Sequence, residues 1–405
     1  MSAEPAVRAV SVSGSLASAG AERARPHLRL LSLLALGHLV VDSNQGSLSA
    51  LLPYLKVNLA LSYASTGIIV LMATVTSSLI QPIFGYLADK TARRWLLPVS
   101  VLLSSVGFGL TGLAPSYAAV LVLVVLAGCG VAAYHPEGYR TATAVAGDRK
   151  VTGVSVFSTG GNIGIAVGPP LITALVTGFG LAGTLGLLVP GLLVAVLLAG
   201  VLPVLSGPAP TRARATAETA RPTMVKAMSL LIAVIALRSW TQLGLTTYVP
   251  FYYLDVLKGD PRMVGTLLGV FLGAGAVGTL IAGPIADRVG VRLYVVSVLL
   301  LVTPVAVAFL FARGVLALIL LGVLGFVLVS TFTASIVLGQ AYLPRNPGMA
   351  SGLIVGFATG AGGLGVTALG WLADRWGLMS ALWVSTLLPL GAFALALFLP
   401  EPRAR

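Results

Sequence analysis

A short charged segment reads Gly85-Tyr86-Leu87-Ala88-Asp89-Lys90-Thr91-Ala92-Arg93-Arg94 and separates two long apolar stretches. A similar segment, 198 residues further along, reads Gly283-Pro284-Ile285-Ala286-Asp287-Arg288-Val289-Gly290-Val291-Arg292. Glycine, alanine, aspartate and a basic residue hold the same places in both segments, and the offset is about half the chain. Internal repetition of this kind predicts a protein built from two similar halves.

The residue types of the two segments suit a hinge at a membrane surface. A glycine lets two helices approach closely, an aspartate favours the positive end of a helix dipole, and arginines attract the aspartate and anionic lipids. The alternative is an ordinary basic loop, but the repeat of the same glycine and aspartate favours the hinge. We expect a conformational role for Gly85, Asp89, Arg93, Arg94, Gly283, Asp287 and Arg288.

The composition excludes a water-soluble protein. Of the 405 residues, 57% are hydrophobic and only 9% are charged, which is more apolar surface than one soluble core can bury. The net charge of +13 would suggest nucleic acid in a soluble protein, but here the basic residues lie in the loops between apolar stretches. The single cysteine, Cys129, excludes a disulfide framework and a cysteine metal cluster. We expect no cofactor, no metal and no nucleic acid.

A membrane-crossing helix needs about 20 mainly apolar residues. Twelve stretches meet this need, six on each side of a polar linker at 206–224. They lie near 28–55, 62–87, 95–113, 116–141, 151–177, 183–204, 225–254, 262–286, 292–311, 314–342, 348–372 and 378–399. Their long unbroken apolar runs exclude a β-barrel. The sequence predicts an all-α membrane protein with two pseudo-symmetric six-helix bundles at 28–205 and 225–400, a disordered tail at 1–27 and a short tail at 401–405.

The basic residues predict the orientation. If the N-terminus lies inside, nineteen of the 25 lysines and arginines face the cytoplasm, five face outward and Arg238 lies within a helix. Cytoplasmic loops carry such an excess, so we expect both termini in the cytoplasm and a multi-pass protein of the bacterial inner membrane.

The first span carries polar side chains on one face. His38, Asp42, Gln45 and Ser49 recur at spacings of four, three and four. An ionisable group in the hydrocarbon core costs on the order of 3 kcal/mol, so this stripe should face a central cavity. We expect Asp42 to bind substrate and carry a proton, and Gln45 to bind substrate. The alternative is a structural hydrogen-bond network between helices.

Arg238 lies about twelve residues after Lys226, roughly 18 Å into the seventh span. The repeat offset relates it to position 40, so Arg238 and Asp42 could face each other. Since a buried arginine stays charged, it needs a carboxylate or an anionic ligand. We expect Arg238 and Gln242, one turn on, to bind substrate, while a permanent ion pair with Asp42 is an equal alternative.

Two further spans carry candidate residues. The fourth ends in Tyr134-His135-Pro136-Glu137-Gly138-Tyr139-Arg140, and we expect His135 and Glu137 to take part in proton coupling, with an interfacial charge network as the alternative. The fifth contains Asn162, a candidate substrate residue near the midplane. It also contains Gly164, Gly168 and Pro169, which are expected to allow close packing and bending during conformational change, although ordinary small-residue packing is an alternative.

The pattern Gly-x-x-x-Asp-(Arg/Lys)-x-x-Arg-Arg resembles the loop between helices 2 and 3 of the major facilitator superfamily. The pattern Gly164-x-x-x-Gly168-Pro169 looks like the signature of proton-coupled antiporters in that superfamily. Further motifs resemble its fosmidomycin resistance branch: Asp42-x-x-Gln45-Gly46, Ala50-Leu51-Leu52-Pro53-Tyr54-Leu55, Gln81-Pro82-x-Phe84-Gly85-Tyr86, His135-Pro136-Glu137-Gly138 and Gly160-Gly161-Asn162-x-Gly164. The resemblance implies the major facilitator fold and export of the phosphonate fosmidomycin in exchange for protons.

The sequence therefore predicts a monomeric, proton-coupled antiporter that exports a small anionic or amphiphilic compound, such as fosmidomycin or another drug, by alternating access. Its other partners are protons and membrane lipids. One alternative is proton-coupled uptake of a sugar or organic acid, and another is a non-transporting membrane scaffold or sensor. An enzyme is not expected, because no nucleophile with a base and no pair of metal ligands occurs at a usable spacing. ATP is not expected to drive transport, because the sequence has no Gly-x-x-x-x-Gly-Lys loop.

Overall fold

The computed structural model describes residues 27–90, 93–147, 150–205 and 224–401. All regular structure in these ranges is helical. The predicted tail at 1–27 and linker at 206–224 lie almost entirely outside them, and so does most of the predicted tail at 401–405.

The first half supplies six spans. Its helices are α1 (Leu28–Asn58), α2 (Tyr63–Leu79), α3 (Gln81–Lys90), α4 (Leu96–Leu110), α5 (Tyr117–Val145), α6 (Lys150–Phe179), α7 (Leu188–Gly200) and α8 (Leu202–Leu205). The second predicted span is divided into α2 and α3 around Ile80, two residues before Pro82. Short 3₁₀ segments, η1 (Thr111–Leu113) and η2 (Gly180–Leu187), extend α4 and precede α7.

The second half repeats this order. Its helices are α9 (Val225–Phe251), α10 (Met263–Val289), α11 (Val291–Phe311), α12 (Gly314–Tyr342), α13 (Pro347–Gly352), α14 (Thr359–Trp376) and α15 (Leu378–Ala396). A π-helical turn, η3 (Tyr252–Val256), ends the seventh span, and another, η4 (Leu353–Ala358), joins α13 to α14. Each of the twelve predicted spans corresponds to one of these helices or to one such series of short helices.

Ten stretches of the described residues are long and apolar enough to cross a membrane. One of them, Gly153–Gly200, has 48 residues and covers most of α6 and all of α7. The helix α1 is not among the ten, although it has 31 residues, because His38, Asp42, Asn44 and Gln45 lie in its middle. The first span is therefore the most polar one.

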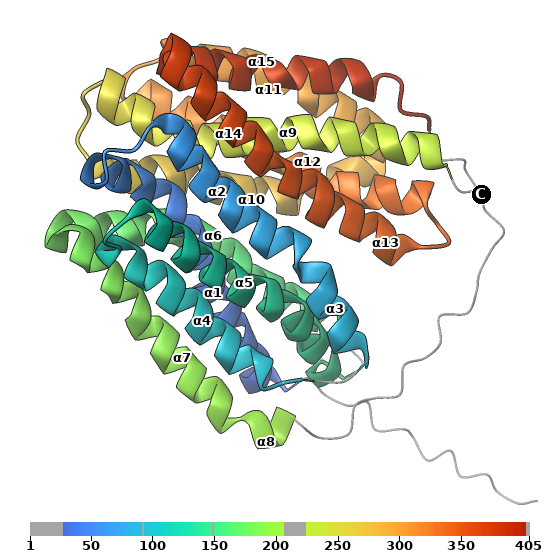
Figure 1. Ribbon diagram of the computed structural model, residues 1–405. Helices are drawn as coiled ribbons and strands as arrows, with labels where there is room; N and C mark the ends of the chain where they lie inside the picture. Colours follow the sequence, from blue (N-terminus) through green and yellow to red (C-terminus); the bar gives the residue numbers. More distant parts are fainter. Residues whose placement is uncertain (1–26, 91–92, 148–149, 206–223, 402–405) are drawn as a thin grey trace, which may run out of the picture.

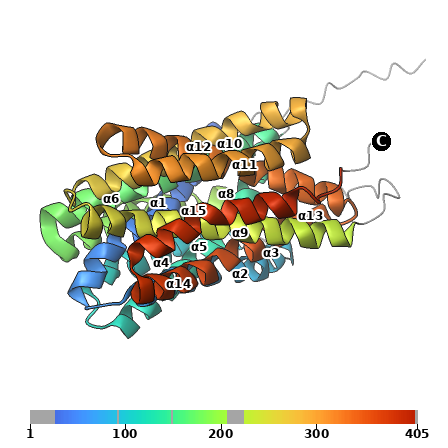
Figure 2. The same ribbon diagram turned by 90° about the horizontal axis from the view of Figure 1, so that it is seen from above.

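The helices form two bundles that lie side by side (Figures 1 and 2). We call the end where α1 and α9 begin the terminal end, and the end where these two helices finish the remote end. Contacts between the halves are made chiefly by α2 with α14 and by α6 with α10. Near the remote end, Gly67 lies against Thr367 and Gly265 against Pro169 and Pro170.

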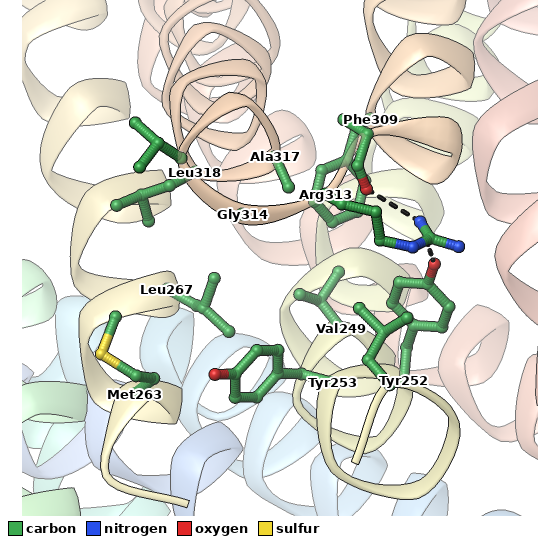
Figure 3. A pocket seen from close by; sticks show the side chains of 13 residues that line it. Val249, Tyr252, Tyr253, Met263, Leu267, Phe309, Arg313, Gly314, Ala317 and Leu318 are labelled. Atoms are coloured by element: carbon green, nitrogen blue, oxygen red, sulfur yellow. Dashed lines mark hydrogen bonds between the residues drawn. The ribbon is translucent and has the colours of Figure 1, made fainter. Parts of the chain in front are cut away.

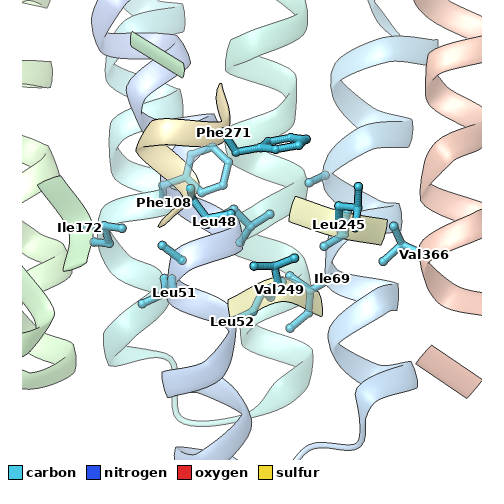
Figure 4. Close-up of a cluster of buried hydrophobic side chains, with 14 of the residues drawn as sticks. Leu48, Leu51, Leu52, Ile69, Phe108, Ile172, Leu245, Val249, Phe271 and Val366 are labelled. Atoms are coloured by element: carbon cyan, nitrogen blue, oxygen red, sulfur yellow. The ribbon is translucent and has the colours of Figure 1, made fainter. Parts of the chain in front are cut away.

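Buried apolar side chains from both halves pack together toward the remote end of the molecule (Figure 4). Both halves contribute to one continuous cluster there, which we call the remote apolar layer: Leu48, Leu51, Leu52, Ile69, Phe108, Ile172, Leu245, Val249, Phe271 and Val366. Toward the terminal end, a separate cluster contains residues of the second half alone, from Ala227 to Leu399. The two halves thus share a core at the remote end but not at the terminal end.

Close packing of α1 on α6 depends on glycines. A Cβ atom at Gly160, Gly164 or Gly168 would overlap the backbone carbonyl of Ala35, Leu39 or Ser43, respectively. In lipid the surrounding acyl chains are as apolar as leucine, so helices associate through such close packing rather than through burial alone. Gly164 and Gly168 therefore pack inside the first half, whereas Pro169 contacts α10 of the second half.

Candidate functional site

Asp42 lies between two histidines. Its Oδ2 is 3.3 Å from Nε2 of His38, one turn earlier on α1, and its Oδ1 is 3.3 Å from Nε2 of His135 on α5. The two imidazole rings meet edge to face with their centroids 4.9 Å apart. We call His38, Asp42 and His135 the His-Asp-His cluster. One carboxylate thus faces two titratable side chains from two helices.

The backbone determines how each imidazole is oriented. Nδ1 of His38 is 2.8 Å from the carbonyl oxygen of Phe157, and Nδ1 of His135 is 2.8 Å from that of Val131. Because a carbonyl only accepts, each Nδ1 must carry the hydrogen, and a neutral ring then has a lone pair on Nε2. Both lone pairs would face carboxylate oxygens. Each contact becomes favourable when a proton lies between the two atoms, so the cluster is built to bind protons.

The His-Asp-His cluster is largely buried and is surrounded by aromatic side chains. The side chains of Asp42 and His135 are 15% and 18% exposed, whereas that of His38 is 4% exposed. Phe157 stacks on His38 with centroids 4.2 Å apart, and the rings of Tyr134 and Tyr139 lie about 6 Å away. A Cβ at Gly161 of α6 would lie only 2.5 Å from His38 Nε2 and 2.6 Å from Asp42 Oδ2. Because glycine has no side chain, position 161 leaves room for the side chains of His38 and Asp42.

The same three side chains offer donor atoms within 4.8 Å of one another, which is a spacing that a metal ion accepts. The sequence itself predicts no metal. Histidine and carboxylate side chains inside a membrane also form proton relays, so a chelator distinguishes bound protons from a bound metal at this cluster.

Arg238 lies apart from this cluster. Its side chain is only 1% exposed; Nε donates to Thr331 Oγ1 at 3.1 Å and Nη2 to the Leu328 carbonyl at 3.1 Å, both on α12. The ring of Phe332 lies 5.8 Å from the guanidinium carbon. Among the described residues no carboxylate forms an ion pair with Arg238. The alternative of a permanent Arg238–Asp42 pair is therefore not what the structure shows, because Asp42 faces α5.

The other residues that were predicted to bind substrate or protons lie on four different helices. Gln45, Asn162 and Gln242 are half-buried on α1, α6 and α9. Glu137 is 1% exposed, and its carboxylate lies near the backbone of Arg93 and the side chain of Thr141. It follows His135 by two positions on α5, so it points away from the His-Asp-His cluster. Its electrostatic neighbours are arginines, Arg94 among them.

The hinge segments lie at the terminal end. In the first, Gly85 lies near Pro136 of α5, Arg93 is exposed and Arg94 is buried; the side chain of Asp89 is outside the described part. In the second, a Cβ at Gly283 would meet no heavy atom within 4 Å, and Asp287 and Arg288 are exposed.

Within the second segment, Gly290 connects α10 to α11 with a φ of +94°, a conformation that favours glycine. Arg292 then donates to the Leu397 carbonyl at 2.9 Å and contacts Glu401 at 3.3 Å. A cation placed there stabilises the C-terminal end of α15.

An apolar cavity of about 270 Å³ lies in the second half near the remote end (Figure 3). Tyr252, Tyr253, Leu267 and Leu318 help to line it, and Arg313 donates to the Tyr252 hydroxyl at 3.1 Å. All lining residues belong to one half. Relative movement of the halves would not move this cavity from one side of the membrane to the other, so we do not assign the substrate to it.

Comparison with known proteins identifies the family. The sequence profile of the Major Facilitator Superfamily matches residues 34–366. This chain belongs to the major facilitator superfamily. It is 32% identical over 392 residues to the fosmidomycin resistance protein of Escherichia coli, covering 96% of both chains. It is also 35% identical over 380 residues to the uncharacterized MFS-type transporter YfnC of Bacillus subtilis, covering 91% of this chain and 92% of that one.

Solved structures of major facilitators share the fold. A bacterial homologue of the human lysosomal transporter Spinster, in an inward-facing and occupied conformation, aligns with a TM-score of 0.70 at 16% identity over 92% of this chain and 94% of that chain. The nucleoside transporter NupG aligns with a TM-score of 0.73 at 16% identity over 91% and 98%. The predicted fold and the resemblance to the fosmidomycin resistance branch are thus confirmed, and the chain is a multi-pass membrane protein.

Parts of the site in this major facilitator cannot be recognised from its sequence. His38 was noted only as one member of the polar stripe, because nothing local shows that its Nδ1 meets the carbonyl of Phe157. The meeting of Asp42 with His135 likewise depends on how α1 packs on α5. The predicted roles of the site residues stay predictions.

Proposed function

We propose that this major facilitator is a proton-coupled antiporter that exports a small anionic or amphiphilic compound, with fosmidomycin as the first substrate to test. The name of the Escherichia coli relative supports this substrate. The proton-binding geometry of the His-Asp-His cluster is the observation that carries the proposal. Transport, rather than catalysis, is the activity expected of its residues.

The cluster changes charge when protons bind. Two imidazoles and one carboxylate at 3.3 Å separations can hold a shared proton at each contact. When a shared proton leaves, the negatively charged carboxylate of Asp42 faces the lone pair of an imidazole Nε2. This repulsion is costly in a site of low dielectric. A ligand shifts a conformational equilibrium only when it binds the two states differently. We infer that protons bind the cluster more tightly in one state of the transporter, with His135 and Asp42 in the leading roles and Glu137 as a further carrier.

Arg238 is proposed to contact the anionic group of the substrate. A buried cation without a carboxylate partner is costly, and a phosphonate or carboxylate group would compensate its charge. Asp42, Gln45, Asn162 and Gln242 are proposed as further substrate contacts. In this scheme the first half carries the protons and part of the substrate site, while Arg238 of the second half binds the anionic group, so movement of one half against the other couples the two.

The remote apolar layer supports an inward-facing state. The basic residues favour cytoplasmic termini, so the remote end would face outward in the bacterial inner membrane. Closure of that end, together with separate cores at the terminal end, corresponds to opening toward the cytoplasm. The Gly85–Arg94 and Gly283–Arg292 segments would then act as hinges on the cytoplasmic side. We propose that the transporter works as a monomer, since each chain contains both halves.

The test is transport by the purified protein in liposomes. A pH gradient should drive fosmidomycin across the membrane, and His135→Gln should stop gradient-driven transport while leaving exchange of labelled for unlabelled substrate. Asp42→Asn should also stop gradient-driven transport. A chelator should change neither activity, because protons rather than a metal occupy the cluster. Gradient-driven transport by Asp42→Asn at the normal rate would contradict the proposal.

Measurements in cells and in liposomes distinguish this function from its two alternatives. In cells, an exporter lowers the accumulation of its substrate and raises fosmidomycin resistance until an uncoupler collapses the proton gradient. A proton-coupled importer of a sugar or organic acid would raise accumulation instead. A scaffold or sensor would give no flux in liposomes.

A further inference from the structure

The two halves are also joined by a carboxylate at the remote end. Asp374, near the end of α14 in the second half, accepts hydrogen bonds from the backbone N–H of Tyr63 at 2.8 Å and of Ala64 at 2.9 Å. These are the first two residues of α2, in the first half. A side chain of one half thus caps a helix of the other.

This contact completes the hydrogen bonding of the α2 N-terminus. The first four N–H groups of a helix have no partner within the helix. Here Ser62 supplies its Oγ to the N–H of Ser65 at 3.1 Å and its carbonyl to that of Thr66 at 3.1 Å. The N–H groups of Tyr63 and Ala64 bond to Asp374. If the halves separated at this end, two of the four groups would lose their partner and the helix dipole would lose a negative charge.

A second carboxylate of the same half holds Tyr63. The Tyr63 hydroxyl donates to Asp255 Oδ2 at 2.7 Å, and Lys56 Nζ lies 4.5 Å from the centre of the Tyr63 ring. Asp255 lies in η3, which follows α9. Tyr63 therefore contacts the second half through both its backbone and its side chain.

Glycine permits this approach. A Cβ at Gly370 of α14 would lie 2.6 Å from the Tyr63 carbonyl oxygen and 2.8 Å from Ala64 Cα. Only glycine fits at such a distance without movement of the backbone. Gly370 precedes Asp374 by four residues, or about one turn, so both lie on the same face of α14.

The same six-residue pattern occurs three times in this sequence. Gly370-Trp371-Leu372-Ala373-Asp374-Arg375 matches Gly85-Tyr86-Leu87-Ala88-Asp89-Lys90 and Gly283-Pro284-Ile285-Ala286-Asp287-Arg288 at the glycine, the alanine, the aspartate and the basic residue. The first two copies end α3 and α10 at the terminal end, and the third ends α14 at the remote end. In the third copy the glycine permits close approach and the aspartate caps the neighbouring helix.

We propose that this third copy is a latch, in which Asp374 holds the remote end closed by capping α2 and releases α2 when that end opens. Since the contact exists only when the halves meet, it favours the closed state over the open one. Capping and dipole contributions of the usual size correspond to a shift of about tenfold in that equilibrium.

The experiment measures opening with a single reporter cysteine. Cys129→Ser removes the native thiol, and Ile69→Cys places a new one in the remote apolar layer, where Ile69 is fully buried. The rate of labelling by a water-soluble maleimide, measured on full-length protein in detergent, reports how often this layer opens. Asp374→Asn should raise the rate about tenfold. The matched control is Asp260→Asn, because Asp260 lies at the same end but accepts from Arg262 N within its own loop, so the rate should not change.

A second variant tests the donor side of the contact. Tyr63→Pro removes one N–H at the first helical position, where proline is well tolerated, and the preceding Ser62 already has the extended conformation that proline requires. Tyr63→Phe is its control, since it loses the hydroxyl but keeps the N–H. Asp374→Asn should raise the labelling rate less in the Tyr63→Pro protein than in the Tyr63→Phe protein, because Tyr63→Pro has already removed one of the two N–H groups that bond to Asp374. Equal effects in both, or Asp374→Asn labelling at the rate of Asp260→Asn, would overturn the latch.

Discussion

The substitution Gly161→Ala would separate proton coupling from folding. The added Cβ would lie 2.5 Å from His38 Nε2 and 2.6 Å from Asp42 Oδ2, whereas ordinary contact begins at about 3.4 Å. The two atoms must therefore move by roughly 0.8–0.9 Å, and both belong to side chains that can rotate. The 3.3 Å contact between them would be lost, while the backbone of α1 would stay in place.

The energetic effect follows from that lost contact. A hydrogen bond that involves a charged group contributes about 1.5–3 kcal/mol. At about 1.4 kcal/mol for each factor of ten, the shared proton would be bound roughly ten- to a hundredfold less tightly. Alanine is a better helix former than glycine by up to about 1 kcal/mol, so α6 itself should not be weakened. Coupling should fail in a protein that still folds.

Two measurements check this prediction. Fosmidomycin transport driven by a pH gradient in liposomes should fall at least about tenfold, and the midpoint of thermal unfolding in detergent should stay within the range of the parent protein. Gly178→Ala is the control, because it changes the same helix at a position with no heavy atom within 4 Å. If Gly161→Ala transported at the parent rate, the His-Asp-His cluster would not be the proton site.

Four further substitutions test packing and the anion contact. Gly164→Ala would push a Cβ into the backbone of α1 and should lower the free energy of unfolding by about 1–3 kcal/mol. Gly283→Ala meets no heavy atom within 4 Å and should raise the free energy of unfolding slightly. Equal midpoints of thermal unfolding for the two variants would refute this expectation. Arg238→Gln should abolish transport of an anionic substrate, and full transport in the liposome assay would exclude its proposed role. Tyr248→Phe removes a buried 2.6 Å hydrogen bond from α9 to α14 and should cost about 1–3 kcal/mol in unfolding measurements without changing transport.

The sequence by itself determined the spans, the halves and the family. Membrane spans are local, since hydrocarbon demands about 20 apolar residues in succession and internal hydrogen bonding makes them helices. The repeat of Gly85–Arg94 at Gly283–Arg292 depends on residue order alone. Asp42 and Arg238 could also be selected from sequence, because a charge inside an apolar run is conspicuous wherever the helix points.

Only the tertiary structure decided which of these residues meet. The repeat offset suggested that Asp42 faces Arg238, but side-chain partners depend on the rotation of each helix about its axis, which hydropathy does not report. Packing of α1 on α5 and α6 instead turns Asp42 toward His135, and Arg238 turns toward α12. The cap that Asp374 forms on α2 joins residues more than 300 positions apart, so no local pattern in the sequence could have revealed it.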